Sequence, residues 1–221
     1  MSTSIKTIER KPRVPSATPP LLLLLHGYGS NERDLFDFAD YVDPRLHVVS
    51  ARAPLNLPWG GFAWYEFGGS PGHLLPDPAT RTKAVELLER FVGGLAARVG
   101  ADPRRVYLLG FSQGAILTFA LAARAPQLLA GIIALSGYLD TDQLPGPIPT
   151  GLAALPILHM HGSSDTVIPV AAAHLSRDLI QPLAARYEYH EYPVGHSIHP
   201  DGLRLLQTWL TARLDAQDEK A

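Results

Sequence analysis

A serine flanked by glycines stands within residues 110–114, which read GFSQG. The segment lies between a short apolar run and a helix-forming stretch, and in that context a G-x-S-x-G pattern predicts a nucleophile elbow. In such a turn a strained backbone projects the serine hydroxyl above the sheet, while the glycines let the strand and the helix approach closely. The helix start also offers backbone N–H groups to a developing negative charge. We therefore predict that Ser112 is a catalytic nucleophile.

A serine hydroxyl is a weak nucleophile at neutral pH, so it needs a base, and the base needs an orienting acid. Asp165 lies four residues beyond an apolar run that ends at His161, and His196 follows the last predicted strand. The chain order Ser, Asp, His and the placement after strands are both typical of a triad built on a parallel sheet. We predict that Ser112, Asp165 and His196 form this triad.

Three other residues compete for these roles. Asp140 and Asp142 also follow a predicted strand and could supply the acid. His199 is three residues beyond His196 and could supply the base, although a position lining or capping the entry to the last helix suits it better.

Histidines gather in the second half of the chain and raise the question of a metal. His159 and His161 alternate along one predicted strand, so they share a face, and His196 and His199 could complete a cluster. That strand carries no acid at ligand spacing and the chain has no thiolate, so structural hydrogen bonds are the favoured role. We expect neither a metal nor another cofactor.

An acyl-transfer site also needs donors for the oxyanion. The N–H of Gln113, immediately after the nucleophile, is the first candidate. The second should come from the loop after the first central strand, residues 26–29 (HGYG), where we assign the N–H of Tyr28. His26 is interpreted as a buried histidine that fixes this loop.

Short apolar runs alternate with helical patterns along the chain, which predicts a mostly parallel sheet with helices on both faces, an α/β fold. Asn31 should cap the first helix. We expect a single domain over residues 21–214, preceded by a segment 1–20 that carries an edge strand at 5–9 and followed by a tail, 215–221. The predicted strands are 21–25, 46–51, 106–109, 132–135, 157–161 and 187–192, and the predicted helices are 32–41, 80–99, 113–124, 170–180 and 200–213.

Residues 52–79 hold no regular pattern and are rich in proline, glycine and aromatic residues. A structureless stretch of this length is usually functional or mobile, and its aromatic side chains offer the apolar surface that an acyl group needs. We assign Trp64, Tyr65 and Phe67 to substrate binding. A second loop, 139–155, is expected to help shape the site.

Composition limits the alternatives. The chain has 221 residues, 46% of them hydrophobic, and a net charge of −2, so a general nucleic-acid surface is not expected. It contains no cysteine, which excludes disulfides, thiolate metal sites and a cysteine nucleophile. The longest strongly apolar run, 21–25, is too short for a membrane span or a signal peptide. We expect a soluble, cytoplasmic protein.

Five segments of the chain match a known pattern: 25–35 (LHGYGSNERDL), 110–115 (GFSQGA), 135–138 (LSGY), 161–169 (HGSSDTVIP) and 192–197 (YPVGHS). Together they resemble the phospholipase/carboxylesterase family of α/β-hydrolases, which includes acyl-protein thioesterases. The resemblance spans residues 21 to about 210. It implies a serine esterase in which Ser112, Asp165 and His196 form the triad, with Tyr28 and Gln113 as oxyanion donors. It also implies that residues 63–65 lie beside the acyl site, and it suggests a homodimer.

Departures from the family limit what transfers. The eukaryotic thioesterases carry HGLGD where this chain has HGYGS, so the Tyr28 side chain should alter the acyl entrance. The related dienelactone hydrolases use cysteine, which is absent here, and no insertion is long enough for a cap domain. The sequence thus predicts a serine carboxylesterase for small-molecule esters with short to medium acyl chains. A thioesterase or lysophospholipase with the same triad is the alternative. A non-catalytic binding protein and a histidine-bound metal hydrolase are the less favoured function classes.

Overall fold

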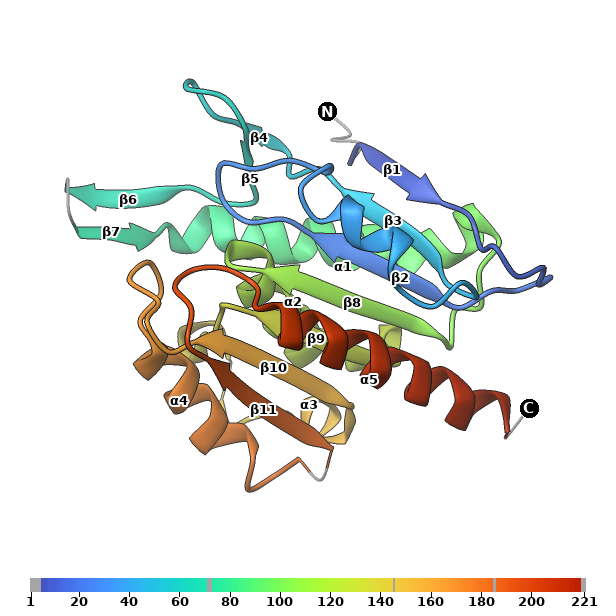
Figure 1. The fold of residues 1–221 in the computed structure, drawn as a ribbon. Helices are drawn as coiled ribbons and strands as arrows, with labels where there is room; N and C mark the ends of the chain where they lie inside the picture. Colours follow the sequence, from blue (N-terminus) through green and yellow to red (C-terminus); the bar gives the residue numbers. More distant parts are fainter. Residues whose placement is uncertain (1–4, 71–72, 145, 185, 220–221) are drawn as a thin grey trace.

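The computed structural model describes residues 5–70, 73–144, 146–184 and 186–219. Its centre is a seven-stranded sheet in the order β1-β3-β2-β8-β9-β10-β11 (Figure 1). All neighbouring strands are parallel except β1 and β3, so the predicted mostly parallel sheet is confirmed. The strands are β1 (Thr7–Arg10), β2 (Leu21–Leu25), β3 (His47–Ala51), β8 (Val106–Phe111), β9 (Gly131–Leu135), β10 (Ile157–Gly162) and β11 (Tyr187–Tyr192).

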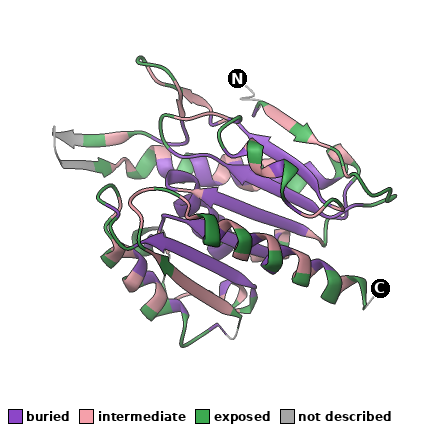
Figure 2. Cartoon of the chain, in the orientation of Figure 1, coloured by how far each residue is buried: buried purple, intermediate pink, exposed green. Residues whose placement is uncertain are grey.

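Helices cover both faces of the sheet. Side chains of α1 (Pro78–Val99), α2 (Gln113–Arg124) and α4 (Val170–Ile180) join one hydrophobic cluster. Side chains of α5 (Pro200–Asp218) and the 3₁₀-helix η1 (Phe36–Asp40) join the other. The central strands therefore lie between two apolar layers, and Figure 2 shows them buried along their length.

The first central strand illustrates why these sequences form buried parallel strands. β2 consists of five leucines, none of which is exposed. Leu21, Leu23 and Leu25 pack into the cluster under α1 and α2, whereas Leu22 and Leu24 pack into the cluster under α5. A strand covered on both faces needs apolar residues at every position, which explains a continuous run without alternation.

The order of the strands reverses beside β2. The chain passes from β2 to β3 on one side and later to β8 on the other. In open parallel sheets the loops that leave the strands diverge at such a reversal, and ligands bind in the crevice outside the carboxyl ends. The loop after β2 and the turn after β8 therefore meet at the point where a site is expected.

The predicted helix 32–41 is wrong in type. Asn31 does accept a hydrogen bond from the Arg33 N–H through its side chain, but the following turns close with i→i+3 bonds and the only regular element is η1. Glu32 is buried against Arg52, whose hydrogen bonds lower the pKa of that carboxyl to about 2. This tertiary contact ties the first turn to Arg52, the residue that follows strand β3. The local sequence pattern alone favours an α-helix, and the tertiary contact overrides it.

The two predicted loops contain more structure than expected. Residues 52–79 form two small antiparallel hairpins, with residues 71–72 outside the described residues. In residues 139–155, where 145 is also outside them, lie a 3₁₀-turn and a short helix. The added elements are β4 (Leu55–Asn56), β5 (Phe62–Ala63), β6 (Phe67–Ser70), β7 (His73–Pro76), η3 (Thr141–Gln143) and α3 (Thr150–Ala154), and a third 3₁₀-turn, η2 (Pro126–Leu128), precedes β9.

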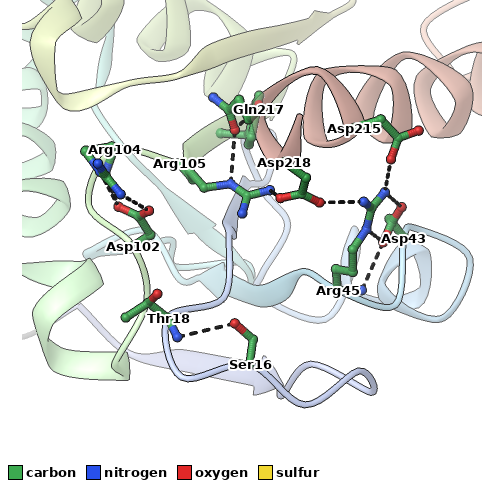
Figure 3. Close-up of polar contacts among 11 residues, drawn as sticks. Ser16, Thr18, Asp43, Arg45, Asp102, Arg104, Arg105, Asp215, Gln217 and Asp218 are labelled. Carbon is green, nitrogen blue, oxygen red and sulfur yellow. Dashed lines mark hydrogen bonds and ion pairs between the residues drawn. The ribbon is translucent and has the colours of Figure 1, made fainter. Parts of the chain in front are cut away.

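The last helix is longer than predicted. It continues to Asp218, so residues 215–218 of the expected tail are helical, while 1–4 and 220–221 lie outside the described residues. Arg45 binds Asp43, Asp215 and Asp218 and thereby fastens the helix end to the loop before β3 (Figure 3). No helix in the described part of the chain is long and apolar enough to cross a membrane.

Candidate active site

Ser112 occupies the turn between β8 and α2 in a backbone conformation that side chains rarely adopt, with φ 55° and ψ −119°. A Cβ at Gly110 would collide with the carbonyl of Gly114, and one at Gly114 would collide with the carbonyl of Leu25. Glycine is therefore required at both positions for the helix start to lie directly against β2 and β8. The Ser112 N–H donates to the Leu135 carbonyl at 2.9 Å, which holds the turn at the carboxyl edge of the sheet.

His196 lies between the other two predicted triad residues. Its Nε2 is 2.8 Å from Ser112 Oγ, and its Nδ1 is 2.7 Å from Asp165 Oδ2. Because a carboxylate only accepts hydrogen bonds, Nδ1 carries the proton and Nε2 is left to accept from the serine hydroxyl. The ring also packs against Phe111, with 4.9 Å between centroids. The structure thus brings Ser112, His196 and Asp165 into one hydrogen-bonded chain.

Asp165 is held by its own turn. Its Oδ1 accepts hydrogen bonds from the N–H groups of Val167 and Ile168, at 2.8 and 2.9 Å. These bonds leave Oδ2 directed to His196, and the Asp165 side chain is fully buried. The carboxylate therefore has a single orientation, which is what a group that fixes an imidazole tautomer requires.

The residues that carry the two predicted oxyanion donors, Tyr28 and Gln113, line one cleft together with Ser112. Within the described residues, neither the Tyr28 nor the Gln113 N–H has a hydrogen-bond partner. The bonds from Gly29 N–H to the Phe62 carbonyl and from Ser30 N–H to the Gly27 carbonyl hold the loop around Tyr28.

His26 fixes the same loop, as the sequence predicts. The buried ring donates from Nδ1 to the Gly27 carbonyl at 2.7 Å and accepts from the Ala53 N–H at Nε2. Burial lowers the pKa of His26, so the neutral ring with one donor and one acceptor fits its surroundings. His26 makes no hydrogen bond to the triad among the described residues.

A cleft of about 510 Å³ opens beside Ser112. Phe67 forms part of its wall and packs edge-on against Tyr28, with 5.0 Å between ring centroids. Other apolar walls, which the sequence interpretation missed, come from strand β7, from the turn that follows Asp165 and from the first turns of α2 and α4. They are Leu75, Ile116, Val167, Ile168, Pro169 and Ala172. For Val167, Ile168 and Pro169 the only available signal was their place after the end of β10.

Trp64 and Tyr65 correct the expectation for substrate contacts. Both side chains are buried in the core and neither lines the cleft. Trp64 Nε1 donates to the His26 carbonyl at 2.9 Å. The Gln113 side chain accepts from the Trp64 N–H and donates to the Tyr65 carbonyl. These residues therefore support the site from behind, while Phe67 alone of the three predicted contacts reaches the cleft.

The competing acids and base lie elsewhere. Asp140 forms a buried ion pair with Arg81, and Asp142 is exposed near the start of η3. His199 caps α5 by accepting from the Asp201 N–H and stacks on Tyr192. Asp140 and His199 thus have partners other than the triad residues. For Asp142, no contact with the triad is found among the described residues.

The strand histidines bind protein groups. His159 contacts the Tyr187 hydroxyl and the Gly137 carbonyl, and burial lowers its pKa to about 3. His161 Nε2 is 2.8 Å from the Ile168 carbonyl. Among the described residues, no group of three or more histidine, cysteine, aspartate or glutamate side chains is placed to hold a metal ion.

Known proteins match this chain along most of its length. The model of the phospholipase/carboxylesterase family matches residues 8–214. A probable carboxylesterase of Oryza sativa subsp. japonica is 28% identical over 207 residues, covering 87% of this chain and 88% of that protein. Acyl-protein thioesterase 1 of Saccharomyces cerevisiae is 31% identical over 177 residues, covering 78% and 76%. The crystal structure of esterase PE8 superimposes with a TM-score of 0.81 at 28% identity, covering 94% and 98%.

The sheet, its helices and the turn around Ser112 define an α/β-hydrolase. Within that class the chain belongs to the phospholipase/carboxylesterase family, and it is a hydrolase that acts on ester bonds.

Proposed function

We propose that the protein is a serine carboxylesterase that cleaves short- to medium-chain acyl esters through Ser112, His196 and Asp165. The observation that carries this proposal is the unbroken chain of two hydrogen bonds, 2.8 and 2.7 Å long, from Ser112 Oγ through His196 to Asp165. This series of hydrogen bonds ends at Ser112, which lines an apolar cleft large enough for a small ester.

The first half of the reaction forms an acyl-enzyme. Ser112 Oγ attacks the ester carbonyl carbon while His196 Nε2 takes the hydroxyl proton. Asp165 stabilises the imidazolium, and the N–H groups of Tyr28 and Gln113 receive the oxyanion. The carbon–oxygen bond to the leaving alcohol then breaks, and His196 returns the proton to that alcohol.

The second half repeats these steps with water. His196 takes a proton from water as the oxygen attacks the acyl carbon, and the collapse of the second tetrahedral intermediate releases the acid. The proton passes from His196 back to Ser112 Oγ, so the enzyme returns to its starting state. Each oxyanion donor is expected to contribute about 3 kcal/mol to transition-state binding.

A thioester is the second candidate substrate, because the chain is 31% identical to an acyl-protein thioesterase. The same triad would serve it, since only the leaving atom changes from oxygen to sulfur. The Tyr28 side chain is 37% exposed at the cleft and packs on Phe67, so we expect it to restrict the acyl entrance.

Activity on a graded panel of p-nitrophenyl esters, a matched thioester and a lysophospholipid would test the proposal. We expect Ser112→Ala to lower kcat by on the order of 10⁶ with an unchanged circular dichroism spectrum. A fluorophosphonate probe should label the wild type and leave this variant unlabelled. Activity that persists in Ser112→Ala and is lost with a chelator would instead indicate a metal hydrolase.

A further inference from the structure

His161 lies directly behind the predicted catalytic acid. Its side chain is completely buried at the end of β10, four residues before Asp165. Its Nε2 is 2.8 Å from the Ile168 carbonyl oxygen and 3.5 Å from Asp165 Oδ2, the oxygen that accepts from His196. The imidazole therefore touches both ends of the turn that carries the acid.

The neighbours of Nε2 determine the tautomer. A carbonyl and a carboxylate oxygen are both acceptors, so the nitrogen between them must carry the proton. The Nε2–H donates to the Ile168 carbonyl, and the same nitrogen lies 3.5 Å from Asp165 Oδ2, so its partial positive charge is close to the carboxylate. The turn is then closed from two sides, because the Ile168 N–H donates to Asp165 Oδ1 while the Ile168 carbonyl accepts from His161.

The other nitrogen shows that the histidine is not there for packing alone. His161 Nδ1 is buried and has no hydrogen-bond partner among the described residues. A buried polar atom without a partner is unfavourable, and leucine would fill a similar volume without that cost. Stability alone would therefore favour an apolar residue at this position, whereas the Nε2–H contact can only be made by a donor.

We propose that His161 is a positioning residue that holds the Asp165 carboxylate in line with His196. The inference rests on the proposed function and adds a fourth residue to its apparatus. Without the Nε2–H donor, the turn between Asp165 and Ile168 loosens and Oδ2 moves relative to His196 Nδ1. Because the turn also supplies cleft residues Val167 and Ile168, small displacements there reach the reacting groups.

Two substitutions and a matched control test this role. His161→Leu removes the donor but keeps the volume, whereas His161→Gln places an amide N–H near the Nε2 position. The control is His159→Gln, on the same face of β10, equally buried and without contact to Asp165. For each variant, kcat, KM, the rate of fluorophosphonate labelling and the urea midpoint are measured.

We expect His161→Leu to lower kcat and the labelling rate about 10- to 100-fold with KM within about twofold of the wild type, because a displacement of about 1 Å in a catalytic group costs that much. His161→Gln should recover most of the loss. His159→Gln should lower the urea midpoint but leave kcat within about twofold. If His161→Leu does not fold, His161→Asn decides, since its amide is too short to reach the Ile168 carbonyl and should show the same loss of kcat.

Equal kinetics in His161→Leu and His159→Gln at equal loss of stability would overturn the proposal, as would a His161→Leu enzyme with wild-type kcat. Failure of the proposed function looks different. In that case the wild type itself would show no labelling at Ser112 and no dependence of its activity on that residue.

Discussion

The side-chain amide of Gln113 holds the backbone of Trp64, with 2.8 Å between Gln113 Oε1 and the Trp64 nitrogen. The same amide donates to the Tyr65 carbonyl at 2.9 Å. The residue after the proposed nucleophile therefore lines the cleft, where its backbone N–H is a predicted oxyanion donor, while its side chain holds the backbone of residues 64 and 65. One residue couples the geometry of the predicted oxyanion site to the position of the cleft wall.

Gln113→Leu should separate these two contributions. The backbone N–H stays, but the buried Trp64 N–H and Tyr65 carbonyl lose their partners, which costs about 1–3 kcal/mol each. We expect a lower urea midpoint and at least a tenfold lower kcat/KM for a hexanoyl ester. Gln113→Glu keeps the acceptor for the Trp64 N–H and loses the donor to the Tyr65 carbonyl. Its urea midpoint and kcat/KM should therefore lie between those of the wild type and Gln113→Leu. Wild-type kinetics in Gln113→Leu would contradict the coupling.

Phe67 and Trp64 should differ in what their loss affects. Phe67→Ala removes an apolar wall of the cleft, so kcat/KM should drop more for hexanoyl than for acetyl esters, because apolar burial of the longer chain is lost. Trp64→Ala instead opens a cavity in the core and should lower the free energy of unfolding by about 3–5 kcal/mol. Rates over an acyl series and urea unfolding distinguish the two. The assignment fails if Trp64→Ala changes chain-length preference while Phe67→Ala does not.

Buried neutral histidines make stability depend on pH. Burial lowers the pKa of His159 to about 3 and also lowers that of His26, whereas an unfolded chain titrates these groups near 6.5. Below pH 6.5 the unfolded state binds protons that the native state does not, so the free energy of unfolding falls as pH falls, by up to about 1.4 kcal/mol per pH unit for each histidine. Urea unfolding from pH 7 to pH 5 measures the slope. His159→Gln should reduce it, and an unchanged slope would contradict the role of His159.

The end of α5 should matter for stability and not for catalysis. Truncation after Leu214 removes Asp215 and Asp218, both partners of Arg45, and Gln217, which accepts from the Tyr107 hydroxyl. These ion pairs are partly exposed, so the loss should be about 1–2 kcal/mol in the free energy of unfolding. The kcat should stay at the wild-type value, since the network in Figure 3 contains none of the residues of the proposed triad. A large loss of kcat at a small loss of stability would contradict this separation.

The strands and the order of the proposed triad could be predicted because they rest on local signals. A wholly apolar run such as 21–25 must be covered on both sides, and the GFSQG turn is constrained by contacts between residues four apart, Gly110 and Gly114. Asp165 and His196 could then be placed by their positions after strands. These inferences needed no knowledge of which way a side chain points.

The predictions were wrong where the structure depends on the direction in which a side chain points or on a contact between residues distant in sequence. An aromatic residue in a segment rich in glycine and proline suits a core or a cleft equally. The Trp64 backbone N–H donates to the Gln113 side chain and its ring N–H donates to the His26 carbonyl, and these tertiary contacts hold the ring in the core. The helix expected after Asn31 was wrong because the Glu32–Arg52 pair joins residues distant in sequence. The sequence favoured a structural hydrogen bond for His161, but its relation to Asp165 could not be predicted, since that relation depends on the fold of the intervening turn.

The backbone of Ser112, with its φ of 55°, has a consequence for attempts to improve this enzyme. A side chain in that conformation costs on the order of 1–3 kcal/mol, and glycine would remove the cost. Selection for heat resistance alone would therefore favour Ser112→Gly and produce a more stable protein without the proposed nucleophile. A screen of variants by melting temperature must therefore also measure turnover, because at Ser112 a substitution that raises stability lowers activity.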